Sequence, residues 1–350
     1  MPELPEVEVV RVGLEPAVTG ALVTSVTVFD ARSLRRHPGP SEDFVDRLVG
    51  RTIAAAVRRG KFLWLPLVPS PAAASEPPRP PAPTDRRAVS KTPALSEIQE
   101  TGARVDRIRG VSGLTAAPSP EFPKEAVVVH LGMSGQVLLR APDAPDDALT
   151  RIRIELVSPA HGALLLNFAD QRIFGSMAID DLVPTADGLR AGLGAEAPHV
   201  PRSVSHIARD PLDPAFDDAR FLAALAKRNT GIKRAMLDQS LVSGIGNIYA
   251  DEALWAAKVH FEQPTSTLGR AKATLLLSEV RQVLGKALGE GGTSFDAQYV
   301  NVNGASGYFS HSLNVYGQQG KPCPRCGRPI IRESFMNRGS HFCPLCQRLR

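Results

Sequence analysis

The chain has 350 residues, of which 43% are hydrophobic and 22% charged, and its formal net charge at pH 7 is +5. This composition fits a globular protein with room for two or three domains. No apolar run is long enough to span a bilayer, and the N-terminus lacks the basic start and apolar stretch of a secretory signal. The sequence therefore argues against membrane-spanning and secreted proteins, and we expect a cytosolic protein.

The first eight residues, MPELPEVE, place Glu3, Glu6 and Glu8 directly behind Pro2. One interpretation is structural, because proline and acidic residues both suit the first turn of a helix. The other is chemical. Removal of Met1 would leave Pro2 with a secondary amine that is partly unprotonated near neutral pH and can attack a carbonyl-type carbon. A neighbouring carboxylate could then transfer protons, and these residues alone leave both interpretations open.

The first half of the chain is rich in predicted strands bounded by turn residues, at 22–29, 61–65, 126–131, 151–156 and 163–168. RIRIEL (151–156) alternates, with Ile152, Ile154 and Leu156 on one face. This pattern predicts an all-antiparallel sandwich or barrel with a helix at the N-terminus. Residues 66–123 interrupt it with twelve of the thirty prolines, and we expect an extended, mobile insertion there.

A segment rich in proline, glycine and aspartate, roughly 184–215, marks a boundary after which the pattern becomes helical. Helices are predicted at 221–228, 232–239, 248–259 and 272–288. Between the second and third lies SLVSGIGN (240–247), in which two glycines permit tight turns and Asn247 is predicted to cap the helix that begins at Ile248. This link between two helices would expose backbone N–H groups to a phosphate.

All four cysteines lie near the C-terminus, as CPRC (Cys323, Cys326) and CPLC (Cys343, Cys346). Two such pairs separated by sixteen residues match the spacing of a structural zinc site with four thiolates, and a cytosolic location argues against disulfides. Residues 321–350 contain seven basic side chains and one acidic one, a local charge of 7 − 1 = +6. This concentration indicates a polyanionic partner, with nucleic acid the leading candidate.

Three short loops carry further signals, each of which also has an ordinary structural explanation. HLGMSG (130–135) and DQRIFG (170–175) follow predicted strands and place Met133, Arg172 and Phe174 at exposed turns. Apolar side chains and an arginine on such turns suit a protein that unstacks a base. RRGKFL (58–63) offers Arg58, Arg59 and Lys61 as candidate phosphate contacts.

Taken together, these motifs resemble one family, the formamidopyrimidine-DNA glycosylases. The resemblance rests on MPELPEVE, RRGKFL, HLGMSG, DQRIFG, GIKRAMLDQSLVSGIGNIYADEAL (231–254) and the paired cysteines, which occur in the family's order. It implies a fold with an N-terminal antiparallel β-sandwich that carries an N-terminal helix, a helix–two-turn–helix domain and a zinc ribbon. The implied domains are 1–185 (catalytic, with the insertion 66–123), 216–320 (DNA-binding) and 321–350 (zinc finger), with 186–215 as a linker.

The resemblance also implies residue roles. The amine of Pro2 attacks C1′ of a damaged nucleotide and forms an iminium, while Glu3 transfers protons and Glu6 is a further carboxylate of the same helix. The iminium acidifies the C2′ protons, which allows β- and then δ-elimination. Damaged bases must leave the helical stack for this chemistry. The residues that correspond to DNA phosphate contacts are Lys61, His130, Lys233, Asn247 and Arg338, and those that fill the space left by the base are Met133, Arg172 and Phe174.

The implied partner is damaged duplex DNA, with one structural zinc ion, no membrane and a monomeric protein in the bacterial cytoplasm near the nucleoid. ELPE at the start favours oxidised purines, whereas endonuclease VIII-type relatives more often have EGPE. Two features depart from the family pattern: Ile173 stands where a second arginine is common, and the insertion 66–123 has no assignable role. Loop 291–309 is expected to contact the everted base. The alternatives are an enzyme for oxidised pyrimidines and a zinc-ribbon nucleic-acid-binding protein without activity.

Overall fold

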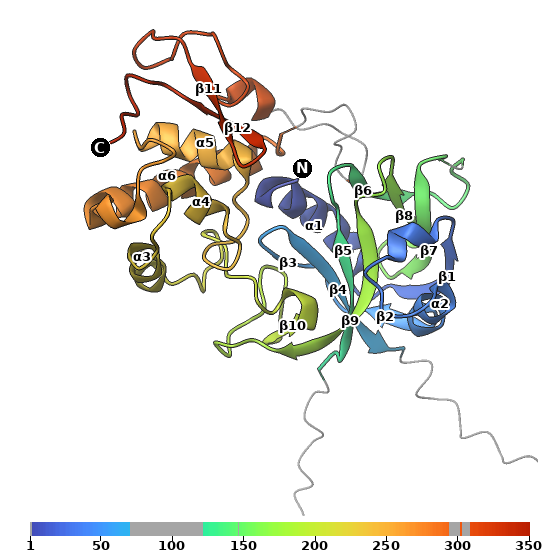
Figure 1. The fold of residues 1–350 in the computed structure, drawn as a ribbon. Helices are drawn as coiled ribbons and strands as arrows, with labels where there is room; N and C mark the ends of the chain where they lie inside the picture. The colour runs from blue at the N-terminus through green and yellow to red at the C-terminus, as the bar shows by residue number, and fades with distance from the viewer. Residues whose placement is uncertain (1, 71–121, 146, 294–301, 303–308) are drawn as a thin grey trace, which may run out of the picture. The chain divides into compact units, whose positions relative to one another are not determined.

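The structure is a computed structural model that describes residues 2–70, 122–145, 147–293, 302 and 309–350 (Figure 1). Residues Met1–Ser70 and Phe122–Arg350 belong to one compact unit, and 71–121, the bulk of the predicted insertion, lie outside the described residues. No helix in the described ranges has the length and hydropathy needed to cross a bilayer. The strands of the N-terminal half are β1 (Leu22–Val28), β2 (Arg51–Ile53), β3 (Val57–Arg59), β4 (Phe62–Pro69), β5 (Glu125–His130), β6 (Gly135–Arg140), β7 (Thr150–Ser158), β8 (Gly162–Asp170), β9 (Ser176–Pro184) and β10 (His199–Pro201).

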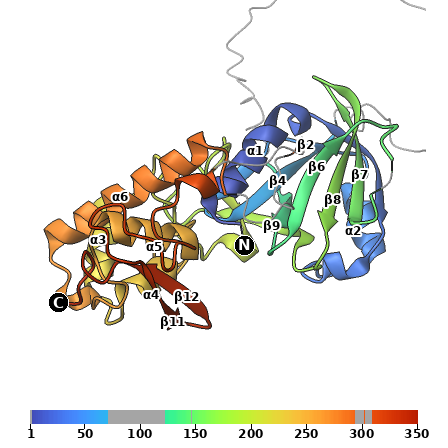
Figure 2. The ribbon, with the colours of Figure 1, turned by 90° about the horizontal axis from the view of Figure 1, so that it is seen from above.

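These strands pair in the order β10-β9-β5-β4-β2-β1-β7-β8-β6, with β3 beside β4, and every pairing is antiparallel. One apolar cluster takes side chains from β4, β5 and β9 and also from β1, β7 and β8. The two halves of the sheet therefore share one core, and Figure 2 shows their strands from above. Ile152, Ile154 and Leu156 are at most 1% exposed, which confirms the face predicted from RIRIEL.

The predicted start of the insertion at residue 66 is wrong. Strand β4 continues through Pro66 to Pro69, pairing with Ala126 of β5 and with Arg51 of β2. Although Pro66 lacks an N–H, its carbonyl still accepts a hydrogen bond from the amide of Ala54 at 2.8 Å, so this residue pairs through its acceptor. At the other end, β5 begins at Glu125, two residues after the predicted boundary at Pro123.

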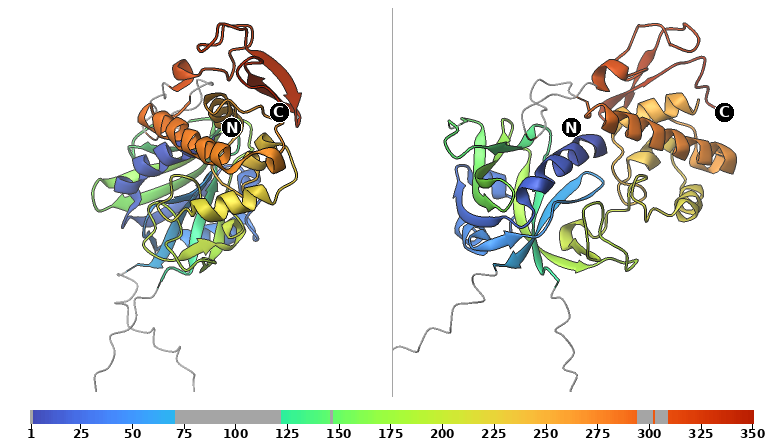
Figure 3. Two further views of the ribbon diagram at one scale, coloured as in Figure 1. Left: turned by 90° about the vertical axis from the view of Figure 1, so that its left-hand side faces the viewer. Right: turned by 180° about the vertical axis from the view of Figure 1, so that it is seen from behind.

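Helix α1 (Leu4–Val18) contacts β3, β4 and β7 of the sheet and also helix α6 (Arg270–Gly289), so the N-terminus lies where β and helical parts meet (Figure 3). Short helical segments follow β1: the 3₁₀ turn η1 (Ala31–Leu34) and α2 (Ser41–Leu48). The segment 186–215, predicted as a linker, is packed. Its strand β10 pairs with β9, and Val200, Val204 and Ile207 enter a second apolar cluster with Trp64.

The helical part comprises α3 (Asp218–Ala226), α4 (Ile232–Leu237), α5 (Asn247–Ala256) and α6, around a core that includes Tyr249, Leu276 and Leu284. All four helices correspond to predicted ones. The prediction that Asn247 caps α5 is wrong. Gly246 occupies the N-cap position, and Asn247 is the first helical residue. The capping oxygens come instead from Glu3, as described below.

The C-terminal residues form a hairpin of β11 (Ile331–Phe335) and β12 (Arg338–Phe342). Met336 and Asn337 make its two-residue turn with φ of 46° and 60°, the left-handed pair that matches the twist of a hairpin. β12 packs against α5. The backbone of the hairpin thus presents Arg338 directly after a tight turn.

Candidate active site

The carboxylate of Glu3 lies at the N-terminal end of α5. It accepts hydrogen bonds from the amides of Gly246 (2.7 Å) and Ile248 (3.0 Å), with Tyr249 at 3.4 Å. A helix N-terminus provides unpaired N–H groups and a partial positive charge, which explains why an acidic side chain replaces a local cap here. Burial nevertheless raises the pKa of Glu3, with the charge of Glu6 adding to the rise and that of Lys61 opposing it. Burial and Glu6 thus favour the protonated form of Glu3, whereas Lys61 and the amides of α5 favour the carboxylate.

The backbone at Gly246 lies directly against this carboxylate. A Cβ atom at Gly246 would overlap the carboxylate of Glu3. Pro2 is itself buried, and the neighbouring amide of Leu4 donates to the carbonyl of Gly244 at 3.0 Å. The SGIG motif is thus required for close approach between the chain's first residues and the start of α5.

Glu6 fixes the other side of the N-terminus. Its Oε2 accepts from the amide of Glu3 at 2.8 Å, and its Oε1 accepts from the hydroxyl of Tyr249 at 2.6 Å. The same oxygen accepts from the amide and hydroxyl of Thr293, both at 2.8 Å. Burial, together with Glu6 and Glu3, raises the pKa of Tyr249 well above its usual range, so the phenol stays a donor. Glu6 therefore joins α1, α5 and the start of loop 291–309, whose residues 294–301 and 303–308 lie outside the described part.

Lys61 lies in the two-residue turn between β3 and β4. The turn is held by Asp210, whose Oδ2 accepts from the amide of Gly60 at 3.0 Å and from Arg58 at 2.9 Å. Gly60 has φ of 57°, and a Cβ there would lie 2.5 Å from the hydroxyl of Ser243, so the turn abuts the loop before α5. Burial lowers the pKa of Lys61; the charge of Glu3 opposes that shift and the charge of Arg338 adds to it. Lys61, Glu3 and Arg338 thus share one electrostatic environment.

Arg58 and Arg59 are not phosphate contacts in this structure, contrary to the expectation from RRGKFL. Arg58 is fully buried and pairs with Glu8 (2.7 Å) and Asp210 (2.9 Å). Arg59 is 6% exposed and donates to the carbonyls of Ala191 and Ile207. Buried and exposed side chains do not alternate along β3, because residues 186–210 cover the face of the strand that would otherwise be exposed. Of the three basic residues in the motif, Lys61 alone keeps part of its surface exposed to solvent.

His130 is the last residue of β5, and its ring stacks on that of Phe62 with centroids 5.8 Å apart. Phe62 directly follows Lys61 in the sequence. Burial, with smaller contributions from Arg36 and Arg35, lowers the pKa of His130 to about 4. The imidazole is therefore neutral near pH 7 and can donate a single N–H to an anion.

Lys233, which the resemblance assigns to the phosphate contacts, is fully buried in this structure. Its Nζ lies 2.7 Å from Oδ1 of Asp251 and 2.6 Å from the hydroxyl of Ser340. The other oxygen of Asp251 accepts from the amide of His341 at 2.9 Å. Sequence could not reveal this burial, because the residues that surround Lys233 come from α5 and β12. The pair secures the hairpin to the helical part.

Asn247 and Arg338 are both found at the start of β12. The side-chain Nδ2 of Asn247 donates to the carbonyl of Gly339 at 3.0 Å, and Arg338, which precedes Gly339 in the sequence, is exposed. Arg338 is close enough for its charge to lower the pKa of both Lys61 and Lys233, although burial is the main cause for each. The structure therefore places Arg338 within electrostatic reach of Lys61 and Lys233.

The two loops 131–135 and 170–175, which we call the wedge loops, lie against each other. A Cβ at Gly132 would overlap the backbone of Phe174 and Gly175. Asp170 joins the loops, because it accepts from the hydroxyl of Ser134 (2.6 Å) and the amides of Arg172 (3.1 Å) and Gly175 (2.6 Å). Met133 is 43% exposed and Phe174 49%, and Arg172 is also exposed. The predicted exposure of all three side chains is confirmed.

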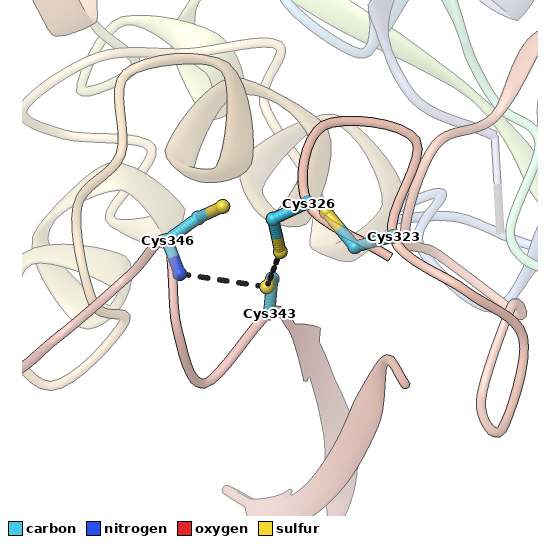
Figure 4. A group of neighbouring side chains, drawn as sticks. All are labelled: Cys323, Cys326, Cys343 and Cys346. Carbon is cyan, nitrogen blue, oxygen red and sulfur yellow. Dashed lines mark hydrogen bonds between the residues drawn. The ribbon is translucent and has the colours of Figure 1, made fainter. Parts of the chain in front are cut away.

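The four cysteines converge, with all their Sγ atoms within 4.8 Å of one another (Figure 4). All four are free thiols, and the sulfurs of Cys326 and Cys343 are 3.4 Å apart. Four thiolates around Zn²⁺ at about 2.3 Å would place their sulfurs roughly 3.8 Å apart, so the donor set and spacing fit a tetrahedral zinc. The indole N–H of Trp255 on α5 donates to the sulfur of Cys323 at 3.4 Å, which is a typical outer contact for a metal-bound thiolate.

Several residues that build this site were not predicted from the sequence. Asp210, Asp170 and Asp251 each hold a candidate site residue or its loop, and Tyr249 binds Glu6. Their only sequence signal is a carboxylate or phenol in a motif-rich stretch, which does not identify the partner. Apart from Arg172, which follows Asp170 by two residues, each partner is distant in the sequence.

Family models cover most of the chain. The "Formamidopyrimidine-DNA glycosylase N-terminal domain" matches residues 1–177, the "Formamidopyrimidine-DNA glycosylase H2TH domain" matches 207–298, and the "Zinc finger found in FPG and IleRS" matches 320–349. Together with the paired cysteines and the carboxylate beside the N-terminal proline, these matches define a zinc-finger DNA glycosylase.

Curated proteins are similar to this chain over its full length. The formamidopyrimidine-DNA glycosylase of Leifsonia xyli is 54% identical, with 100% of both chains covered, and that of Kineococcus radiotolerans is 48% identical, with 99% of this chain and 97% of the relative covered. The chain belongs to the formamidopyrimidine-DNA glycosylase family.

Solved structures of Lactococcus lactis Fpg share the fold. A complex with DNA containing an abasic site is 26% identical with a TM-score of 0.68, and covers 99% of each chain. A variant of the same protein bound to DNA containing Fapy-dG is 27% identical with a TM-score of 0.69, and covers 99% of this chain and 100% of that chain.

Proposed function

We propose that this protein excises oxidised purines from duplex DNA and then cleaves the strand at the resulting abasic site. Family membership and full-length similarity to named formamidopyrimidine-DNA glycosylases support the glycosylase activity. The observation that carries the assignment is the position of Glu3, a buried carboxylate adjoining Pro2 and bound to the N-terminal end of α5.

Pro2 is the proposed nucleophile. Once Met1 is removed, its secondary amine can attack C1′ of the damaged nucleotide, and the bond from C1′ to the base breaks. Loss of the ring oxygen from C1′ leaves an iminium, which acts as an electron sink and acidifies the C2′ protons. Removal of a C2′ proton expels the 3′ phosphate, and a second elimination expels the 5′ phosphate. A single nucleophile thereby serves both base excision and strand cleavage.

Glu3 is the proposed proton-transfer group and Lys61 its cationic neighbour. Burial raises the pKa of Glu3 and lowers that of Lys61, so for both groups it disfavours the charged form. Glu6 is proposed to position two segments. It binds the amide of Glu3, and through Thr293 it holds the start of loop 291–309.

The DNA backbone is proposed to lie along Lys61, His130, Asn247 and Arg338. Lys61 and Arg338 provide positive charge, and the neutral imidazole of His130 provides an N–H. Lys233 is proposed to hold β12, which carries Arg338, in place through its contacts with Asp251 and Ser340. The positive end of α5 and the basic zinc finger add to the attraction for phosphates.

Met133 and Phe174 are proposed to fill the space left by the everted base, and Arg172 to hydrogen-bond the base opposite. The support is the exposure of these side chains on two adjoining loops. We further propose that the chain works as a catalytic domain (1–185), a DNA-binding domain (216–320) and a zinc finger (321–350) joined by 186–215. A monomer acting in the cytoplasm near the nucleoid completes the proposal.

The lesion class is tested by excision from matched duplexes that differ in one base. Purified protein should release 8-oxoguanine opposite cytosine much faster than thymine glycol from the same sequence context. A preference for thymine glycol would instead assign the chain to oxidised pyrimidines. Binding to both duplexes without release of either base would leave only the zinc-finger DNA-binding function.

A further inference from the structure

The second wedge loop has an unfavourable backbone conformation at its tip. Ile173, between Arg172 and Phe174, has φ of 54°, in the left-handed region that β-branched residues rarely adopt. Such a conformation is maintained only where contacts with the rest of the structure fix it. The contacts that fix residues 173 and 174 therefore determine where the exposed ring of Phe174 is presented.

Asp170 fixes only part of this loop. Its oxygens take the amides of Arg172 and Gly175, on either side of the tip, at 3.1 and 2.6 Å. The carbonyls at the tip are bound by Arg35. Its Nη1 donates to the carbonyl of Ile173 at 2.5 Å and its Nη2 donates to the carbonyl of Phe174. A planar guanidinium presents two N–H groups in a rigid fork, which suits two successive carbonyls.

Arg35 is itself well supported. It caps the 3₁₀ turn η1, where its amide donates to the carbonyl of Arg32 at 3.3 Å, and the preceding Leu34 is 5% exposed. Asp30 begins the same turn and accepts from the amide of Arg32 at 3.0 Å. The turn contacts β9 and β7. The guanidinium therefore reaches the wedge loop from a backbone fixed to the sheet.

We propose that Arg35 is a positioning residue for base eversion, which holds the tip of loop 170–175 so that Phe174 enters the duplex in a preformed conformation. This inference rests on the proposed role of the wedge loops. A preformed loop avoids the entropy loss of ordering it during insertion, so the effect falls on the eversion step. Strand cleavage at a site that already lacks its base requires little of that step.

The test compares Arg35→Ala with Arg32→Ala, an arginine of the same turn that is 74% exposed and pairs with Asp30. Each variant is assayed on duplex with 8-oxoguanine and on duplex with a preformed abasic site. Arg35→Ala should slow base excision about tenfold, the loss expected from two hydrogen bonds, while abasic-site incision changes less than about twofold. Arg32→Ala should match wild type on both.

Stopped-flow fluorescence of 2-aminopurine next to the lesion measures eversion separately and should show the same slowing for Arg35→Ala. Arg35→Lys, which keeps the charge and can bind one carbonyl, should recover part of the rate. Arg35→Gln removes the charge and keeps a single NH₂ group, and it replaces the alanine variant if that variant does not fold. For Arg35→Ala, the slope of the logarithm of the DNA-binding constant against the logarithm of salt concentration should equal that of the wild type.

Equal losses on both substrates with a salt slope smaller by about one would make Arg35 a phosphate contact and overturn the proposal. Wild-type eversion and excision rates in Arg35→Ala would overturn it as well. A wild-type protein that excises no oxidised purine would contradict the proposed function instead, and so the two failures are distinguishable.

Discussion

The surroundings of Glu3 and the wedge loops are stabilised in opposite ways. At Glu3 the side chains are buried, and the functional groups themselves take part in the hydrogen bonds that hold α1 to α5. In the wedge loops the backbone is bound by Asp170 and Arg35, while Met133 and Phe174 remain exposed. The first arrangement shifts pKa values for proton transfer, and the second keeps apolar side chains free for an incoming duplex. Substitutions should therefore affect stability and activity together at Glu3 and separately in the wedge loops.

The largest effect is expected for Glu3→Gln. The amide cannot exchange protons as the carboxylate does, so excision should fall by about 10²–10⁴-fold. Its NH₂ group would also face the amide donors of α5, which should lower stability by about 1–2 kcal/mol. Single-turnover excision and urea unfolding measure the two effects. Glu15→Gln, on the same helix and partly exposed, is the matched control and should change neither. Undiminished excision in Glu3→Gln would leave Glu3 only its helix-capping role.

Asp251→Asn extends the comparison to the buried pair behind the hairpin. Removing this charge leaves Lys233 buried without its counter-ion, which should cost about 3 kcal/mol. DNA binding should weaken as well, because β12 carries Arg338. Asp181→Asn removes an exposed carboxylate that lies 3.5 Å from Arg202 and should cost less than about 0.5 kcal/mol. Equal stability of the two variants in denaturant unfolding would show that the buried pair does not hold the hairpin.

Phe174→Ala and Met133→Ala test the other side of the comparison. Excision from intact duplex should slow about tenfold because less of the unstacking energy is offset, and incision at a preformed abasic site should slow less. Stability should change by less than about 0.5 kcal/mol, since both side chains are about half exposed. Leu189→Ala, equally exposed at 49% and outside the wedge loops, is the control and should leave excision unchanged. A marked loss of stability with normal excision would make either residue part of the core.

The smallest effect concerns pH. Burial, with Arg36 and Arg35 nearby, lowers the pKa of His130 from 6.5 to about 4 in the folded protein. Between these values the unfolded chain binds a proton that the folded chain does not, so stability falls as pH decreases through this window. Between pH 7 and 5.5 the wild type should lose about 1 kcal/mol more than His130→Gln, as measured by urea unfolding. Parallel pH profiles for the two proteins would show that His130 does not titrate in this way.

The sequence predicted what depends on local pattern. RIRIEL identified β7 and its buried face, and the cysteine spacing identified the thiol cluster. Strands of three residues such as β3 are too short to show a period, so the burial of Arg58 and Arg59 could not be predicted. The burial of Lys233 and the contact of Arg35 with Ile173 depend on which elements pack together. Such pairings are properties of the tertiary structure rather than of a motif.

The central claim is that the processed N-terminus carries the reaction. It is tested most directly by borohydride reduction during reaction with duplex DNA containing 8-oxoguanine, followed by peptide mass spectrometry. We predict that Met1 is absent, and that one covalent DNA adduct is found on the nitrogen of Pro2. An adduct on Lys61, or an active enzyme that retains Met1, would contradict the account.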